Sequence, residues 1–278
     1  EVLRILPRNN DDVNEEWISD KSRHSCDGLK RQRLDQPYLR KNGSLEPVGW
    51  PEALSTIAGK IKVTDGEKIA AIAGDLADCE SMVALKDLMI DAGCTHIDCR
   101  QDGGAVGEVR SSYIFNSTIA GIEKADAILI IGSNPRWEAP VLNARIRKRY
   151  RMGHLAVGLV APKVDLTYPY AHLGEGPELL DDLLLSSNQF TKTLKGVDRP
   201  MIILGSGALA RKDGAVILGK TRQLAEFCGV VSDDWNGFNV LQRVASRVGG
   251  LDLAFTPSKK SSLDTSGILE AAASGKLE

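Results

Sequence analysis

The amino-acid sequence predicts an α/β fold with mainly parallel sheets. Three segments support this, because apolar runs of strand length at 68–73, 126–131 and 201–204 are each followed by a turn and a helix-like stretch. The run Ala127–Ile131 is unbroken, which is typical of a strand buried on both faces of a parallel sheet. Repeated strand–helix units in this order indicate a doubly wound architecture.

The elements follow from local signals. A polar, irregular segment fills residues 1–50, although residues 1–6 resemble the middle of a strand. The helix at 77–92 is predicted because Met82, Leu85 and Met89 share one face and Gly93 follows it. The helix at 139–150 begins at Pro140, which the first turn tolerates. The remaining predictions are helices at 51–61, 178–195, 213–228 and 268–273, strands at 95–99 and 154–160, an extended pair at 230–231, a turn at 205–207 and a long loop at 100–116.

Composition excludes several classes of protein. The chain has 278 residues and a formal net charge of −2, so no global field draws it onto nucleic acid or an anionic membrane. No apolar run approaches the roughly 20 residues that cross a bilayer. The five cysteines form no CxxC pair, which argues against a disulfide framework. The chain starts at Glu1 rather than Met, and we expect it to be a piece of a longer polypeptide.

Two segments have nucleotide-site features. Gly132–Pro135 joins a predicted parallel strand to a helix, which is where phosphates bind in many α/β proteins. The same helix carries a basic cluster, which is either a solvated helix end or part of a nucleotide-like site: Arg145, Arg147, Lys148, Arg149 and Arg151. The run Gly205–Ala210 fits G-x-G-x-x-A, but the acidic residue expected after the next strand is poorly placed.

Other chemistry receives little support. There is no G-x-S-x-G elbow, and the four histidines have no acid or nucleophile at diagnostic spacing. Cys94, His96 and Cys99 lie close in sequence, but on a strand Cys99 would face away from the other two. We therefore expect buried thiols there rather than a metal site.

Four blocks together resemble one family: Val13–Lys21, Asp27–Leu34, Ile131–Lys148 and Trp235–Gln242. They are similar to the large iron–sulfur subunit of proton-pumping NADH:quinone oxidoreductase, respiratory complex I. The resemblance implies the C-terminal region of that subunit, which is similar to molybdopterin oxidoreductases. It implies two doubly wound, mainly parallel-sheet subdomains of the formate dehydrogenase/DMSO reductase type after a short irregular N-terminal segment.

The domain boundaries expected on this basis divide the chain into three parts. Residues 1–50 would be the remnant of an N-terminal small subdomain. Residues 51–102 and 196–278 would form a discontinuous first α/β subdomain, and 103–195 the second. The iron–sulfur clusters of the family would lie in an N-terminal portion of the parent subunit that this chain lacks.

The chain departs from the molybdopterin enzymes at three positions. Their metal-binding Cys, selenocysteine or Ser has no counterpart in the loop Arg100–Gly107, where Asp102 is the wrong type of ligand. Ala139 stands where a histidine follows their G-S-N-P turn. Ser19 stands near a cysteine that binds an extra cluster in some of them. The resemblance therefore implies no catalytic residue, no metal and no cofactor in this chain.

The leading hypothesis is a cofactor-free structural domain that supports NADH-to-quinone electron transfer occurring elsewhere in the complex. Its partners would be other peripheral-arm subunits, without nucleic acid or direct membrane insertion. It would lie at the cytoplasmic face of a bacterial inner membrane, or on the matrix side in mitochondria. A molybdopterin-binding oxidoreductase fragment and a nucleotide-binding module are the alternatives. A vestigial pocket is expected where three glycine-containing loops meet, with these candidates: Gly103, Gly104, Gly132, Ser133, Asn134, Gly205, Ser206 and Gly207.

Overall fold

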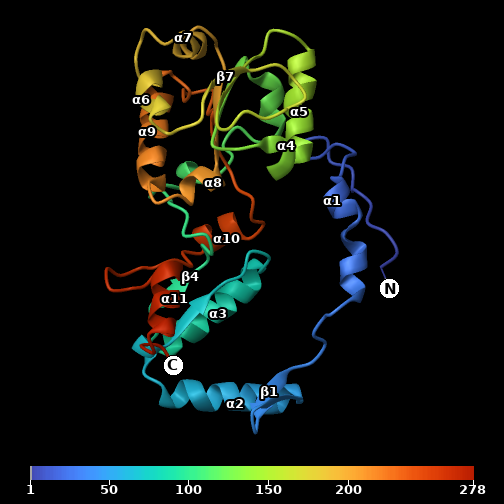
Figure 1. The fold of residues 1–278 in the computed structure, drawn as a ribbon, viewed down its shortest axis with the longest axis vertical. Helices are drawn as coiled ribbons and strands as arrows, with labels where there is room; N and C mark the ends of the chain where they lie inside the picture. The colour runs from blue at the N-terminus through green and yellow to red at the C-terminus, as the bar shows by residue number, and fades with distance from the viewer. Residues whose placement is uncertain (1) are drawn as a thin grey trace. The chain divides into compact units, whose positions relative to one another are not determined.

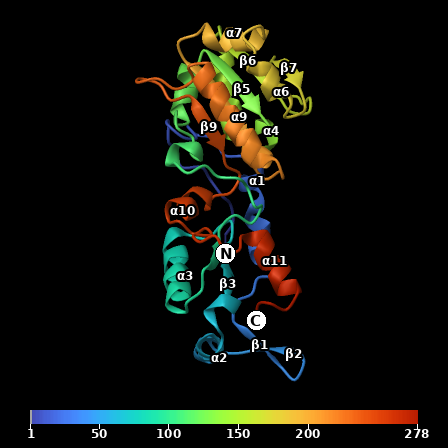
Figure 2. The same ribbon diagram turned by 90° about the vertical axis from the view of Figure 1, so that its left-hand side faces the viewer.

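A computed structural model describes residues 2–278, except for the side chain of Lys30. The chain divides into two compact units. Unit 1 consists chiefly of Asp20–Gly103 and Gly249–Glu278, and unit 2 of Leu6–Ser19 and Gly104–Val248. Figures 1 and 2 label the elements of both units, which are described separately below.

Unit 2 is built on a five-stranded sheet with the order β7-β6-β5-β8-β9, in which all neighbours are parallel. The strands are β5 (Ala127–Ile131), β6 (Ala156–Val160), β7 (Ala171–Gly174), β8 (Pro200–Gly205) and β9 (Phe238–Leu241). β5 lies at the centre, paired with β6 on one side and β8 on the other. The α/β fold with a parallel sheet, predicted from these apolar runs, is confirmed for this unit.

The unbroken apolar strands are explained by helices on both faces of the sheet. Ile128 and Ile130 of β5 point into a core beneath α5 (Pro140–Arg151), whereas Leu129 and Ile131 point into a second core. That second core is covered by α6 (Leu179–Leu183), α7 (Gln189–Lys195) and α9 (Gly214–Phe227). Figure 1 shows α5 on one side of the sheet and α6 and α9 on the other, and Figure 2 looks onto the α9 face. Alternate residues of a strand face opposite ways, so both sets must be apolar.

Three elements of unit 2 differ from the sequence-based expectation. The edge strand β7 and the strand β9 were not predicted, and the predicted turn at 205–207 begins a short helix, α8 (Ser206–Leu209). The predicted grouping of 196–278 with the first subdomain also differs from the structure. Residues 200–205 and 238–241 supply two strands of the five-stranded sheet. The chain up to Val248 therefore belongs to unit 2.

Unit 1 has a smaller sheet than expected. β3 (Ala70–Ile72) and β4 (His96–Asp98) form a parallel pair, accompanied by α3 (Cys79–Asp91) and α11 (Thr265–Ala273). α2 (Trp50–Val63) and the hairpin of β1 (Tyr38–Lys41) and β2 (Ser44–Pro47) complete it, together with part of α10 (Arg247–Asp252). Within the described residues of this unit the parallel sheet has two strands. The sequence had predicted a larger, doubly wound sheet here.

Asp98 connects the elements of unit 1. Its carboxylate is fully buried, accepts hydrogen bonds from Arg100 Nε at 2.9 Å and Nη2 at 3.0 Å, and accepts another from Thr265 N–H at 3.1 Å. The last of these bonds ties the first turn of α11 to the end of β4. Burying a carboxylate is tolerated when such donors satisfy it, and in this way Asp98 joins β4 to α11.

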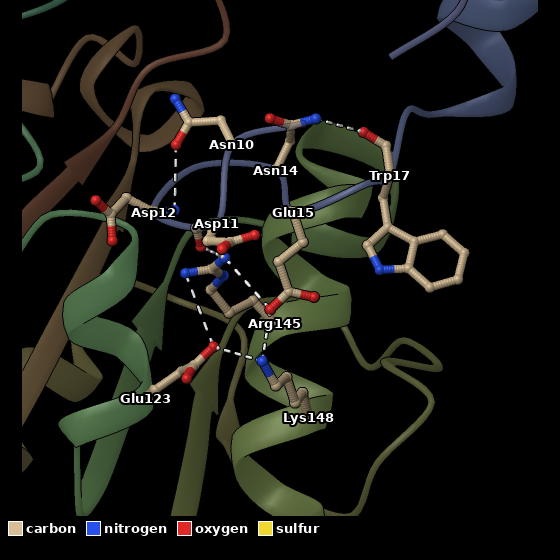
Figure 3. A network of polar contacts seen from close by, with 9 residues as sticks. All are labelled: Asn10, Asp11, Asp12, Asn14, Glu15, Trp17, Glu123, Arg145 and Lys148. Carbon is tan, nitrogen blue, oxygen red and sulfur yellow. Dashed lines mark hydrogen bonds and ion pairs between the residues drawn. The ribbon is translucent and has the colours of Figure 1, made fainter. Parts of the chain in front are cut away.

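The N-terminal segment packs on α5 through a polar network (Figure 3). Arg145 is buried, donates to the carbonyl oxygen of Asp11 and pairs with Glu15 at 3.4 Å. Lys148 pairs with both Glu15 and Glu123. Residues 2–6, which the structure describes, form no strand, so that expectation was wrong. The basic cluster of α5 is therefore only partly solvated, and two of its arginines hold loops in place, since Arg149 also donates to the carbonyl oxygen of Ala125 at 2.8 Å.

Candidate functional site

The candidate site is a cavity at the carboxyl ends of the central strands of unit 2. From β5 the chain winds outward through β6 to β7, then returns to β8 on the other side of β5 and continues to β9. The strand order thus reverses between β5 and β8, and ligands of open α/β sheets bind at this type of crevice. A cavity of about 300 Å³ opens there, near the lower limit for small-molecule pockets.

The turns after β5 and β8 come into direct contact. Gly132 has φ +60°, and a Cβ atom at this position would lie 2.5 Å from the Cβ of Ala208. A Cβ on Gly205 would lie 2.4 Å from the carbonyl oxygen of Gly132. Glycine is needed at both positions because the two backbones approach so closely. The G-x-G-x-x-A pattern at Gly205 therefore has a packing explanation that involves no phosphate.

The structure brings some of the predicted pocket residues together and places others elsewhere. Gly132, Ser133, Asn134 and Gly207 line the cavity, and Gly205 packs against the backbone of Gly132. Ser206 is buried at the start of α8. Gly103 and Gly104 are not among the lining residues. Gly103 is the last residue of a unit 1 segment, and Gly104 is the first residue of a unit 2 segment. The loop after Gly104 contacts α8, because Ala105 N–H donates a hydrogen bond to the carbonyl oxygen of Leu209 at 2.9 Å.

Sequence reasoning missed the residue that determines the polarity of the cavity. Glu138, the last residue of α4 (Pro135–Glu138), accepts a 2.7 Å hydrogen bond from the backbone N–H of Asn134. Its second oxygen, Oε2, lies 3.9 Å from Arg243 Nε. Glu175 adds another carboxylate to the lining. A glutamate four residues after an asparagine in a G-S-N-P turn was the available signal.

The cationic side chain in the lining is already paired. Arg211 donates from Nε and Nη2 to the two carboxylate oxygens of Asp213, at 2.7 and 2.9 Å. This contact raises the pKa of Arg211 and lowers that of Asp213. The guanidinium charge is thus offset at the rim, and Glu138 and Glu175 give the cavity its acidic character.

Several polar atoms at the cavity lack hydrogen-bond partners. Among the residues that the structure describes, Ser133 Oγ, Asn134 Oδ1 and Glu138 Oε2 are buried atoms without one. Ser133 as a whole is only 3% exposed. Buried polar atoms in folded proteins are nearly always satisfied, so Asn134 Oδ1 and Glu138 Oε2 each need a donor, and Ser133 Oγ can take either a donor or an acceptor.

Comparison with known proteins identifies the family. Residues 33–271 match the family model described as molybdopterin oxidoreductase. The chain belongs to the molybdopterin oxidoreductase family. Residues 1–27 match the model described as NADH-ubiquinone oxidoreductase NDSU1/NuoG-like, 4Fe-4S domain. Part of the 4Fe-4S domain model thus falls within this chain, and among the described residues no group of three or more His, Cys, Asp or Glu could hold a metal.

Several curated relatives are G subunits of NADH-quinone oxidoreductase. The chain is 47% identical over 271 residues to the G subunit of NADH-quinone oxidoreductase from Rickettsia conorii, covering 97% of this chain and 40% of the relative. It is 48% identical over 273 residues to the same subunit from Rickettsia felis, covering 98% and 41%. It is thus homologous to the G subunit over nearly its whole length, and it spans about two fifths of the length of these relatives. None of the helices in the described residues is long and apolar enough to cross a membrane.

The cavity does not fit the dinucleotide form of the pterin cofactor that the family implies. The pyrophosphate of a dinucleotide is anionic, and backbone N–H groups at a strand-to-helix turn are its usual donors. Here the N–H of Asn134 is bound by the protein's own carboxylate, and Glu175 adds negative charge to the lining. The loop Arg100–Gly107 offers neither a thiol nor a hydroxyl to a metal.

Proposed function

We propose that this chain is a structural domain of the G subunit of an NADH-quinone oxidoreductase, and that it works without a bound pterin or metal. Homology at 47–48% identity over nearly the whole chain supports the assignment to that subunit. The hydrogen bond between Asn134 and Glu138 carries the second part, because it fills the anion position with a carboxylate. The two large cores on either side of the sheet give the domain its rigidity.

In this role the domain packs against other subunits of the peripheral arm. Electron transfer from NADH to quinone takes place elsewhere, through clusters in the remainder of the parent subunit and its neighbours. Residues 1–27 are the end of the cluster-bearing domain, and their attachment to α5 through Arg145 and Lys148 couples the two parts of the subunit. The domain lies at the cytoplasmic face of a bacterial inner membrane as a peripheral part of the complex.

Metal and pterin analysis of the purified full-length subunit tests the cofactor-free assignment. We expect no stoichiometric molybdenum or tungsten, and no fluorescent pterin after acid oxidation. About one molybdenum or tungsten atom per chain, together with a pterin, would overturn the proposal. Binding of NADH or GTP to the same protein by calorimetry would instead favour a nucleotide-binding module.

A second experiment separates a structural from a catalytic role. Arg145→Ala removes the attachment of the N-terminal segment without touching the cavity, so it should lower the amount of assembled complex. The NADH:quinone turnover of each assembled complex should stay the same. A fall in turnover with normal assembly would contradict a purely structural role.

A further inference from the structure

We propose that the cavity at the ends of β5 and β8 binds a small organic cation with N–H donors, of the amidinium or guanidinium class. This goes beyond the structural role of the domain and does not depend on it. The cavity lies at the carboxyl ends of parallel strands, where open α/β sheets bind ligands. Its hydrogen-bond acceptors and carboxylates favour a cationic ligand.

The first argument is the set of hydrogen-bonding atoms that the cavity presents. Asn134 Oδ1 and Glu138 Oε2 are acceptors, and Ser133 Oγ can accept as well. All three residues line the cavity, and none of these atoms has a hydrogen-bond partner among the described residues. The N–H of Asn134, which would suit an anion, is consumed by Glu138. The ligand must therefore bring donors, and amidinium groups bring several in one plane.

The second argument is charge. Glu138 and Glu175 both line the cavity, whereas Arg211 is held in a two-point pair with Asp213. Arg243 Nε forms an ion pair with Glu138 Oε2 at 3.9 Å, and this distance is beyond hydrogen-bond range, so the oxygen can still accept a hydrogen bond from a ligand. A cationic donor would form a charge-assisted hydrogen bond there, which is roughly twice as strong as a neutral one.

The third argument is shape and polarity. Much of the remaining cavity wall is apolar, and it includes Ile131, Val160, Pro162, Leu180 and Ile217. A volume of about 300 Å³ suits a ligand of one ring rather than a dinucleotide. The apolar wall accommodates a flat hydrocarbon body while the acceptors bind its charged end.

The test uses three probes of equal size and different charge: benzamidinium, benzamide and benzoate. Each is titrated into the full-length subunit, with binding followed by ligand-observed NMR and calorimetry. We expect saturable binding of benzamidinium, binding of benzamide weaker by about ten-fold or more, and none of benzoate. Equal binding of benzoate, or no saturable benzamidinium signal up to about 10 mM, would overturn the proposal.

Variants assign the binding to the cavity. Glu138→Gln retains an acceptor for the Asn134 N–H and removes the charge, so benzamidinium affinity should fall about ten-fold. Glu226→Gln, an exposed residue of α9 outside the cavity, makes the same charge change and should have no effect. An unchanged melting temperature shows that Glu138→Gln is folded. Equal affinities of the Glu138→Gln variant and the unmodified protein would place the probe elsewhere and overturn the proposal. Metal and pterin analysis of the same preparation reports separately on the cofactor-free assignment.

Discussion

The backbone N–H of Asn134 donates a 2.7 Å hydrogen bond to Glu138 Oε1. This bond joins the N-cap of the short helix α4 to its last residue, and both residues line the cavity. In a phosphate-binding turn this N–H would face an anion. Ala139 stands where the molybdopterin enzymes carry a histidine, and this difference is visible in the sequence alone. The neighbouring glutamate is a second difference, because it places a negative charge against the N–H of this turn.

Gly132 should be intolerant of any side chain. In Gly132→Ala the residue would keep φ near +60° and its Cβ would overlap that of Ala208. The left-handed conformation costs about 1–2 kcal/mol for a non-glycine residue, and overpacking adds roughly 1–3 kcal/mol. We expect the free energy of unfolding to fall by about 2–5 kcal/mol in urea denaturation.

Gly103→Ala is the matched control for this substitution. Gly103 has φ +65°, and a Cβ atom at this position would meet no atom within 4 Å. It should therefore show only the conformational cost of about 1–2 kcal/mol. If the two variants were equally stable, the contact between the turns after β5 and β8 would not be tight in solution.

The central strands were predictable and the edge strands were not. β5 and β8 are buried on both faces, so their sequences are continuous apolar runs. β9 contains Asn239, which is fully buried. Its burial is tolerated because its Oδ1 accepts hydrogen bonds from Ser117 N–H at 2.9 Å and Ser117 Oγ at 3.1 Å. A polar residue satisfied by a partner 122 positions away interrupts the pattern that periodicity detects. β7 lies at the edge of the sheet and is largely exposed. Its residues therefore do not need to be apolar, and its sequence shows no apolar run.

The cavity was predictable only in part for the same reason. The turns at Gly132 and Gly205 follow predicted strands, and parallel strands place such turns at one edge of the sheet. The loop around Gly103 could not be placed without knowing the division into units. The predicted domain boundary at residue 195 misplaced β8 and β9, because strand pairing is not encoded in local sequence.

Arg145 should be the most sensitive residue of the basic cluster on α5. It is 5% exposed and contacts Asp11, Glu15 and Glu123. Arg145→Ala leaves these acceptors without their buried donor, so we expect a loss of about 2–4 kcal/mol in the free energy of unfolding. Faster proteolysis within residues 6–19 should accompany it.

Arg151→Ala provides the comparison for this prediction, since Arg151 lies on the same helix and is exposed. Its effect should stay within about 0.5 kcal/mol. A solvated cluster would give similar small effects for both arginines, and that result would refute the role assigned to Arg145.

Attachment of the N-terminal segment should weaken in acid. The hydrogen bond from Lys148 lowers the pKa of Glu15 from its usual value near 4.5. A carboxylate with a lowered pKa stabilises the folded state above the unfolded-state value, and that contribution is lost as pH falls through the folded-state value. The protection factors of residues 10–17 against hydrogen exchange, measured relative to the intrinsic rate at each pH, should therefore fall as the pH is lowered from 4.5. Glu15→Gln should remove this pH dependence, and an unchanged profile would show that another group controls it.

Thiol reactivity should report on which cysteines are buried. Cys94, Cys99 and Cys228 are buried, whereas Cys79 is exposed and Cys26 is half-buried. Burial raises the pKa of Cys228 to about 11, so at pH 8 only about one thiol in a thousand would be ionised. Since the thiolate is the reactive species, a disulfide reagent at pH 8 should modify Cys79 and Cys26 quickly and the other three only on unfolding. Peptide mass mapping before and after denaturation measures this. Rapid modification of Cys228 in the native protein would mean that α9 does not cover its face of the sheet.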